Sequence, residues 1–189
     1  MHEIIKYLFE AGMLKHVKRS GWWACKINDP ESVAEHTFRA AVVAFILAKL
    51  EGESDEIANK LCSAAVFHDM HETRILDLNK IAARYINKQE AISRKVEEDQ
   101  ISLLPSNAQS ALKNLLFTLN EREKTILKDA DLLEMALQAK EYLEIGYKDC
   151  EDWIKNVEKR LKTKSAKALL QQIKKMSSKE WYIGLKKLD

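Results

Sequence analysis

The sequence predicts an all-α fold in a single domain, and three observations carry this prediction. Only 5 Gly and 2 Pro occur in 189 residues, which argues against a turn-rich β-sandwich or a disordered chain. Apolar residues recur with the 3.6-residue period of amphipathic helices, and no window alternates convincingly with the period of a strand. The length fits one domain of the usual ~100–200 residues.

Start and stop signals then place each helix along the chain. The predicted helices cover about residues 4–14, 32–51, 55–71, 79–87, 89–104, a segment from 106 to before 120, 120–146, and two or three shorter helices within 149–189. A polar, aromatic connector separates the first two helices, and a short stretch of mixed character, residues 72–79, follows the third.

Capping residues support several of these boundaries. Three pairs have the spacing of a capping box: Ser32 with Glu35, Ser106 with Gln109, and Ser177 with Glu180. Asn120 begins the longest helix, Pro105 breaks the helix before it, and Gly52 and Gly146 act as C-terminal stops.

Charge and composition exclude several functional classes. The formal net charge is only +2, which leaves no strong electrostatic case for nucleic acid or an anionic membrane as a partner. The longest apolar run, Ala40 to Ala48, is far shorter than the ~20 residues that span a bilayer, and no signal-peptide pattern is visible. The cysteines, an odd number without a C-x-x-C pair, fit reduced thiols in a cytoplasmic protein.

Histidines and acids on apolar helical faces predict a metal site. His68 and Asp69 end an apolar stretch, His36 lies on the capped helix, and Asp131 lies on the longest helix. Two imidazoles and two carboxylates suit Mn, Fe, Co, Ni or Zn and leave room for water and substrate. The residues alone leave open a core histidine, a salt-bridged acid, or Asp129 in place of Asp131.

The order and surroundings of these residues resemble a known family. His36, then His68-Asp69, then Asp131 is similar to the H…HD…D order of the HD-domain metal-dependent phosphohydrolases. The motifs resemble the 5′-deoxynucleotidase branch, which removes phosphate from deoxyribonucleoside 5′-monophosphates; they are Arg19-Ser20-Gly21-Trp22, Glu31 to His36, His68 to Glu72, and Lys128 to Asp131. The resemblance covers about residues 14–146, and residues 149–189 match only as generic helix. It implies one HD-type domain over residues 1–189.

The resemblance assigns roles residue by residue. It implies that His36, His68, Asp69 and Asp131 bind one divalent metal ion, such as Mn or Co, which selects Asp131 over Asp129.

The resemblance also names residues that act on the substrate. Glu72 would orient or deprotonate the attacking water, and we expect it one turn after His68 and Asp69 on the same helical face. Arg19 would grip the phosphate, and Trp22 would pack near the sugar, with Trp23 as a possible alternative.

Two residues near these motifs have more than one possible role. The family has a carboxylate near the sugar or the leaving oxygen, matched here by Asp77, but Leu76 stands where the family has Gly. An N-cap for the next helix is an equal reading of Asp77. We interpret His71 as supporting the site or lying on the surface, since the additional histidines that a second metal would require are absent.

The activity implied is metal-dependent hydrolysis of nucleoside 5′-monophosphates, with a preference for deoxyribonucleotides. The alternatives are an HD phosphohydrolase for cyclic nucleotides or triphosphates, and a non-enzymatic helical module stabilised by the metal. A di-iron oxygen-activating site is disfavoured because the extra histidines are absent. The family also implies a homodimer, and we expect the basic C-terminal helices to pack against the domain or a second subunit rather than bind nucleic acid.

Overall fold

The computed structural model describes residues 1–86 and 89–185, and within them it is helical without a β-strand. Its α-helices are α1 (His2–Gly12), α2 (Val33–Leu50), α3 (Asp55–Phe67), α4 (Glu72–Ile75), α5 (Gln89–Ile101), α6 (Ser106–Phe117), α7 (Glu121–Glu144), α8 (Glu151–Arg160) and α9 (Lys164–Lys175). A lone antiparallel bridge joins Lys18 to Ser32 in the connector. The all-α prediction is confirmed.

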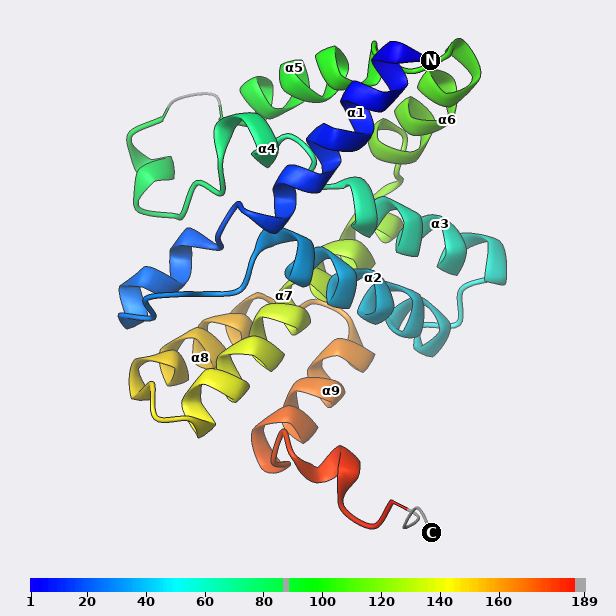
Figure 1. Ribbon diagram of the computed structural model, residues 1–189. Coiled ribbons are helices and arrows are strands. Elements are labelled where there is room, and N and C mark those ends of the chain that lie inside the picture. Colours follow the sequence, from blue (N-terminus) through cyan, green and yellow to red (C-terminus); the bar gives the residue numbers. More distant parts are fainter. Residues whose placement is uncertain (87–88, 186–189) are drawn as a thin grey trace, which may run out of the picture.

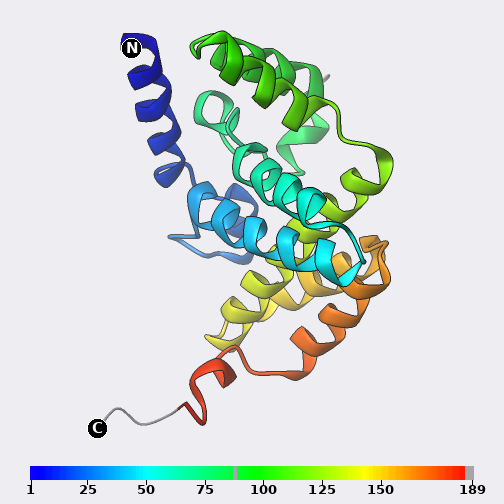
Figure 2. The ribbon, with the colours of Figure 1, turned by 90° about the vertical axis from the view of Figure 1, so that its right-hand side faces the viewer.

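Helices α2 and α7 form the centre of the molecule. Helix α2 packs against both α3 and α7, and α7 packs in turn against α8 and α9. In Figure 1, α1, α5 and α6 lie together at one end and α8 and α9 at the other, and Figure 2 shows the same division from the side. The connector between α1 and α2 packs Trp22 against Tyr142 of α7 and Trp153 of α8, so it lies against the centre of the molecule.

Small side chains bring the central helices close together. Ala44, Ala48, Ala64 and Ala130 are fully buried, and larger side chains such as Leu47 fill the space around them. Alanine lets two helical backbones approach closely, which fixes their relative position through dense packing. Residues on facing turns of α2, α3 and α7 are thereby held in a defined geometry.

The capping box predicted at Ser32 is confirmed, and Asn120 does begin the longest helix. Ser32 Oγ accepts from the Glu35 amide at 3.2 Å, and Glu35 Oε2 accepts from the Ser32 amide at 2.6 Å. Asn120 and Glu123 form the same reciprocal pair at the start of α7. Gly146 follows the end of α7 with a φ of 114°, a backbone conformation that favours glycine.

Other predicted boundaries are wrong, for local reasons. Ser106 does not form a capping box, because Pro105 is the N-cap of α6 and the side-chain Nε2 of Gln109 instead donates to the Leu104 carbonyl at 2.8 Å. The third helix ends at Phe67 rather than His71, because the chain turns before α4.

The helix predicted over residues 79–87 is also wrong. Only one 3-10 turn, Ala82–Arg84, forms there, and residue 87 lies outside the described residues. The pair Ser177 and Glu180 does interact, since Glu180 Oε1 accepts from the Ser177 amide at 2.8 Å. It precedes a 3-10 turn, Glu180–Tyr182, rather than an α-helix. Across the described ranges, no helix is both long and apolar enough to cross a membrane.

Candidate active site

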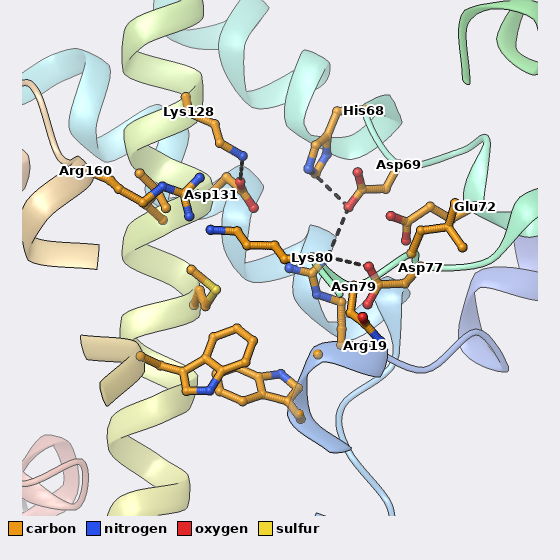
Figure 3. Close-up of a pocket in the computed structure, with 16 residues that line it drawn as sticks. Arg19, His68, Asp69, Glu72, Asp77, Asn79, Lys80, Lys128, Asp131 and Arg160 are labelled. Carbon is orange, nitrogen blue, oxygen red and sulfur yellow. Dashed lines mark hydrogen bonds and ion pairs between the residues drawn. The ribbon is translucent and has the colours of Figure 1, made fainter. Parts of the chain in front are cut away.

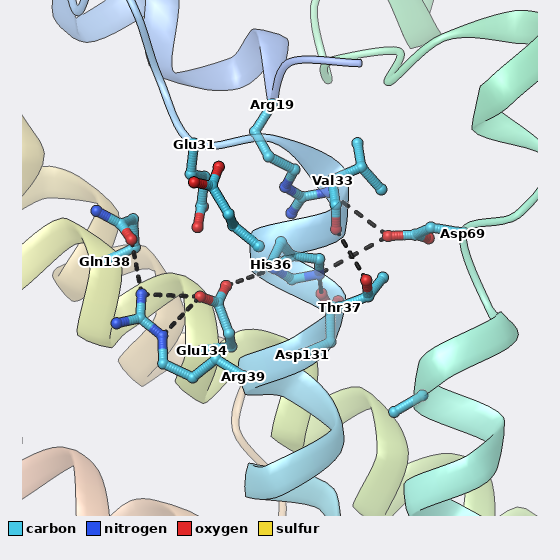
Figure 4. A network of polar contacts seen from close by, with 12 residues as sticks. Arg19, Glu31, Val33, His36, Thr37, Arg39, Asp69, Asp131, Glu134 and Gln138 are labelled. Atoms are coloured by element: carbon cyan, nitrogen blue, oxygen red, sulfur yellow. Dashed lines mark hydrogen bonds and ion pairs between the residues drawn. The ribbon is translucent and has the colours of Figure 1, made fainter. Parts of the chain in front are cut away.

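The four predicted metal ligands converge from three elements of the fold. His36 lies on the first turns of α2, Asp131 on α7, and His68 and Asp69 in the turn after α3. His36 Nε2 lies 3.2 Å from Asp131 Oδ1 and 3.7 Å from Asp69 Oδ2, and His68 Nε2 lies 3.2 Å from Asp69 Oδ2. Figure 4 shows His36 between Asp69 and Asp131, and Figure 3 shows His68 beside Asp69.

The donor atoms fit a divalent metal ion. His36 is 0% exposed, and neither its Nε2 nor Asp69 Oδ2 has a hydrogen-bond partner among the described residues. Buried polar atoms without partners are rare because their desolvation is uncompensated. A cation between them would satisfy both, and a set of two imidazoles and two carboxylates suits first-row transition metals.

The electrostatics of these residues also favour a positive charge at this point. Burial and Arg19 oppose the charged form of His36, but the Asp131 and Glu134 carboxylates outweigh them and raise its pKa to about 10. Burial likewise opposes ionisation of Asp131, yet His36 and Lys128 hold the pKa of that carboxyl well below its usual range. The site therefore stabilises a cation next to ionised carboxylates.

Asp129, the competing acid, does not face the site. Its buried carboxylate accepts from the backbone amide of Lys162 at 3.1 Å and from that of Thr163 at 2.7 Å. It thus holds the segment that leads into α9. Helical residues two apart point ~200° away from each other, so only one of the two acids can face the cavity, and the sequence does not show which.

Glu72 borders the predicted metal site as the first residue of α4. It is buried, and its Oε2 has no hydrogen-bond partner in the part of the chain that the structure describes. Burial, together with the charges of Asp69 and Asp77, raises the pKa of Glu72 to about 9. The expectation that Glu72 shares one helical face with His68 is wrong, because a turn separates α3 from α4. Both residues still face the same cavity (Figure 3).

Arg19 and Asp77 form the opposite wall. Arg19 Nη1 lies 3.8 Å from Asp69 Oδ2 and 3.7 Å from Asp77 Oδ1. Burial opposes the charge on Arg19, but these two carboxylates raise its pKa above the ordinary value. A guanidinium in this position stays protonated and can hold a phosphate through paired hydrogen bonds.

Asp77 is tied to the connector rather than to a helix end. Its Oδ2 accepts from the Ser20 amide at 2.7 Å, and its carbonyl accepts from the Ser20 hydroxyl at 2.6 Å. The N-cap reading of Asp77 is wrong, because Asn79 Oδ1 accepts from the amides of the following turn. Leu76 has a φ of 64° and a ψ of 167°, where glycine would be unstrained.

The structure separates the two tryptophans of the connector. Trp22 is 2% exposed, whereas Trp23 is 55% exposed. The Trp22 ring packs on Trp153 with centroids 4.5 Å apart, and its Nε1 donates to Glu31 Oε1 at 2.9 Å. Trp22 lines the cavity together with Trp153, and Trp23 does not.

These residues enclose a cavity of about 260 Å³ whose rim is basic. Three basic side chains gather beside Asp131 (Figure 3): Lys80 from the loop after α4, Lys128 from α7 and Arg160 from the end of α8. Lys128 forms an ion pair with Asp131. Burial, together with the positive charges of Arg160 and Lys128, lowers the pKa of Lys80. Sequence reasoning missed this rim, since nothing in the spacing of these residues indicates that they meet.

His71 stands apart from the cavity lining. Its Nδ1 lies 3.1 Å from Glu97 Oε1 on α5. Single donor atoms of Asp69, His71 and Glu72 also lie within 4.8 Å of one another, so the count of one metal ion stays a prediction.

Comparison with known proteins places the chain in a family. Residues 11–174 match the family model described as "HD domain". The human 5′-deoxynucleotidase HDDC2 is 33% identical over 151 residues, which cover 77% of this chain and 71% of that protein.

Solved structures share the fold of this chain. The protein whose crystal structure is titled genomics APC5600 is 38% identical, with a TM-score of 0.81 over 96% of this chain and 99% of that one. The HD phosphohydrolase DatZ of cyanophage S-2L, solved with dA and one catalytic Zn²⁺ ion, shares the fold at 17% identity. Its TM-score is 0.58 over 89% of this chain and 96% of that one. The chain therefore belongs to the HD domain family, and its resemblance to the 5′-deoxynucleotidase branch of that family is confirmed.

Proposed function

We propose that this chain is a metal-dependent 5′-deoxynucleotidase, which hydrolyses nucleoside 5′-monophosphates to nucleoside and phosphate and prefers deoxyribonucleotides. The observation that carries the proposal is one cavity lined by His68, Asp69 and Asp131, by the buried Glu72 with its unpartnered Oε2, and by the charged Arg19 guanidinium. His36 Nε2 faces Asp69 and Asp131 and completes the ligand set. A purely structural metal site needs neither Glu72 nor Arg19. The relatives named 5′-deoxynucleotidases support the same reaction class.

The proposed metal site has a defined role. His36, His68, Asp69 and Asp131 would hold the ion. When bound there, a divalent metal lowers the pKa of a water molecule toward ~7 and offsets charge on phosphoryl oxygens.

The remaining groups of the chain perform the other parts of the reaction. Glu72 has a raised pKa in the metal-free site, and a cation bound beside it would favour its ionised form. The carboxylate would then receive the proton of the attacking water at its unpartnered Oε2 and aim that water at phosphorus. Arg19 binds the phosphoryl oxygens and opposes the charge that develops on them. The P–O5′ bond breaks as the new P–O bond forms, and the nucleoside leaves as an alcohol after taking up a proton.

Deoxyribose preference is assigned to Trp22 and Asp77. The Trp22 ring packs on Trp153, and its Nε1 donates to Glu31; these contacts would oppose its displacement by a larger sugar. Asp77, fixed by Ser20, lies on the same wall as Arg19 and can meet a sugar hydroxyl or the leaving oxygen. A rigid wall discriminates against an added hydroxyl through steric exclusion.

One observation favours a second candidate substrate. The basic rim of Lys80, Lys128 and Arg160 could receive additional phosphates, so a nucleoside triphosphate is the alternative to the monophosphate. For either substrate the rim would attract an anion toward the cavity.

The deciding experiment measures release of inorganic phosphate from paired deoxy- and ribonucleoside 5′-monophosphates with Mn²⁺, Co²⁺, Zn²⁺ or Mg²⁺. Triphosphates and cyclic nucleotides form the comparison set. We expect the deoxynucleoside monophosphates to react fastest and Glu72→Ala to lose most turnover while it still binds metal and substrate. Inert metal-loaded protein, or a Glu72→Ala variant with wild-type turnover, contradicts the proposal.

Three further features are part of this proposal. We propose that residues 1–189 act as one domain and that two copies pair as a homodimer, with no nucleic acid or membrane partner. Measurement of the molecular mass in solution tests the pairing. A cytoplasmic location stays a prediction.

A further inference from the structure

A buried carboxylate lies behind the metal-binding histidine, on the side away from the cavity. Glu134 Oε2 is 2.5 Å from His36 Nδ1, and both side chains are 0% exposed. Glu134 follows Asp131 by one turn of α7, and Asp131 faces the other ring nitrogen, Nε2, at 3.2 Å. One helix therefore presents a carboxylate to each nitrogen of the same imidazole (Figure 4).

This arrangement determines which nitrogen is free for a metal. An ionised carboxylate can only accept a hydrogen bond, so the contact with Glu134 places a proton on His36 Nδ1. The lone pair of the neutral ring then lies on Nε2, which points toward Asp69 and Asp131. Metal-binding histidines commonly have their other ring N–H held in this way, which fixes both ring orientation and tautomer.

Glu134 is itself held by a second set of contacts. Arg39, one turn after His36 on α2, donates from Nε to Glu134 Oε1 at 2.9 Å. The same guanidinium donates to Glu141 Oε1 and to Gln138 Oε1, each at 2.7 Å. A fully buried carboxylate is costly unless it is paired and hydrogen-bonded, and here both of its oxygens have partners.

We propose that Glu134 is a positioning residue for metal binding: held by Arg39, it fixes the tautomer and orientation of His36 so that Nε2 faces the ion. This inference rests on the proposed function only in requiring a divalent ion at His36. Sequence reasoning missed Glu134, although it shares the signal that singled out Asp131, an acid on an apolar helical turn between Leu133 and Ala136.

A simpler role would be to clamp α2 to α7 without affecting the metal. That role predicts a lower melting temperature for a Glu134 variant but an unchanged metal affinity of its folded form. The positioning role predicts weaker metal binding, since loss of such a partner typically costs 10–100-fold in affinity. Metal affinity therefore distinguishes the two roles.

The test titrates Mn²⁺ into the full-length chain by calorimetry at constant pH. We expect Glu134→Gln, which keeps the volume but removes the charge, to weaken Mn²⁺ binding ~10–100-fold. The matched control is Glu141→Gln, which removes another Arg39 partner that is 42% exposed at its side chain and should change affinity less than ~3-fold, as expected of an exposed pair.

A second measurement does not depend on a variant that folds. In the Zn²⁺-loaded wild-type chain, nitrogen-15 NMR should show His36 with the metal on Nε2 and a slowly exchanging proton on Nδ1. A metal on Nδ1, or Glu134→Gln affinity equal to that of the wild type, overturns this inference alone. A wild-type chain that binds no divalent ion overturns the proposed function as well.

Discussion

The backbone of Leu76 offers a direct test of how the wall of the site is built. Its φ of 64° and ψ of 167° lie in a region that costs a non-glycine residue ~1–3 kcal/mol. Replacement by Gly removes this strain, while the greater freedom of Gly in the unfolded chain costs ~0.5–1 kcal/mol. Because Leu76 is 61% exposed, part of its side-chain burial is also lost. Leu76→Ala loses the same contacts but keeps the strain, so it is the proper reference.

We expect Leu76→Gly to be more stable than Leu76→Ala by ~0.5–2 kcal/mol, the difference between strain relief and chain entropy. For a chain of this size the melting temperature shifts by ~2–4 °C per kcal/mol, so thermal unfolding followed by circular dichroism can detect the difference between the two variants.

Ile81 provides the matched control in the same loop. It is 62% exposed but has an ordinary φ of −73°. There the usual order should hold, with the Ala variant more stable than the Gly variant by ~0.5–1 kcal/mol. If Leu76→Ala is as stable as Leu76→Gly, the inferred strain is absent and the reasoning is refuted.

Three other predictions concern the site. In metal-free protein the pKa of Glu72 is about 9, above the unfolded value, so its contribution to stability is full below pH ~4.5 and is lost as pH rises toward 9. The melting temperature of the wild type relative to Glu72→Gln should therefore fall over that range, and a constant difference would contradict the assignment. Asp129→Ala should lose ~1–3 kcal/mol of stability, because the backbone amides of Lys162 and Thr163 lose their acceptor, but it should keep its Mn²⁺ affinity. Asp131→Ala should lose Mn²⁺ binding. Equal Mn²⁺ affinity of the two variants would contradict the assignment of Asp131, and not Asp129, as the ligand. Lys80→Ala and Arg160→Ala should raise KM ~2–5-fold with kcat nearly unchanged, and this increase in KM should become smaller as salt is added. A fall in kcat alone would contradict a role of the basic rim in substrate binding.

Local signals in the sequence were enough for the central helices. The capping pairs at Ser32 and Asn120 act within four residues, so their geometry is the same in any fold that contains the helix. The Ser106 pair has the same spacing and fails, because Pro105 already occupies the cap position. A capping motif predicts that a helix begins nearby, and the preceding residue decides at which position.

The site could be predicted only where a family motif supplied the long-range information. Chemistry alone did not separate Asp129 from Asp131, or Trp22 from Trp23. Each choice depends on which neighbour the surrounding helices bury, and no local pattern records that. The basic rim shows the same limit, since the packing of α8 on α7 brings Arg160 to Lys128, and Lys80 reaches them from the loop after α4.

The crossing of α2 and α7 explains why the proposed metal site and the residues that support it come together. Each helix contributes two residues one turn apart: His36 and Arg39 from α2, Asp131 and Glu134 from α7. Residues three apart share a helical face, so one helix–helix contact aligns a ligand and its support on both sides. A change in the distance between α2 and α7 would therefore move the proposed metal ligands and their partners together, so dense alanine packing at this crossing would preserve the site as well as the fold.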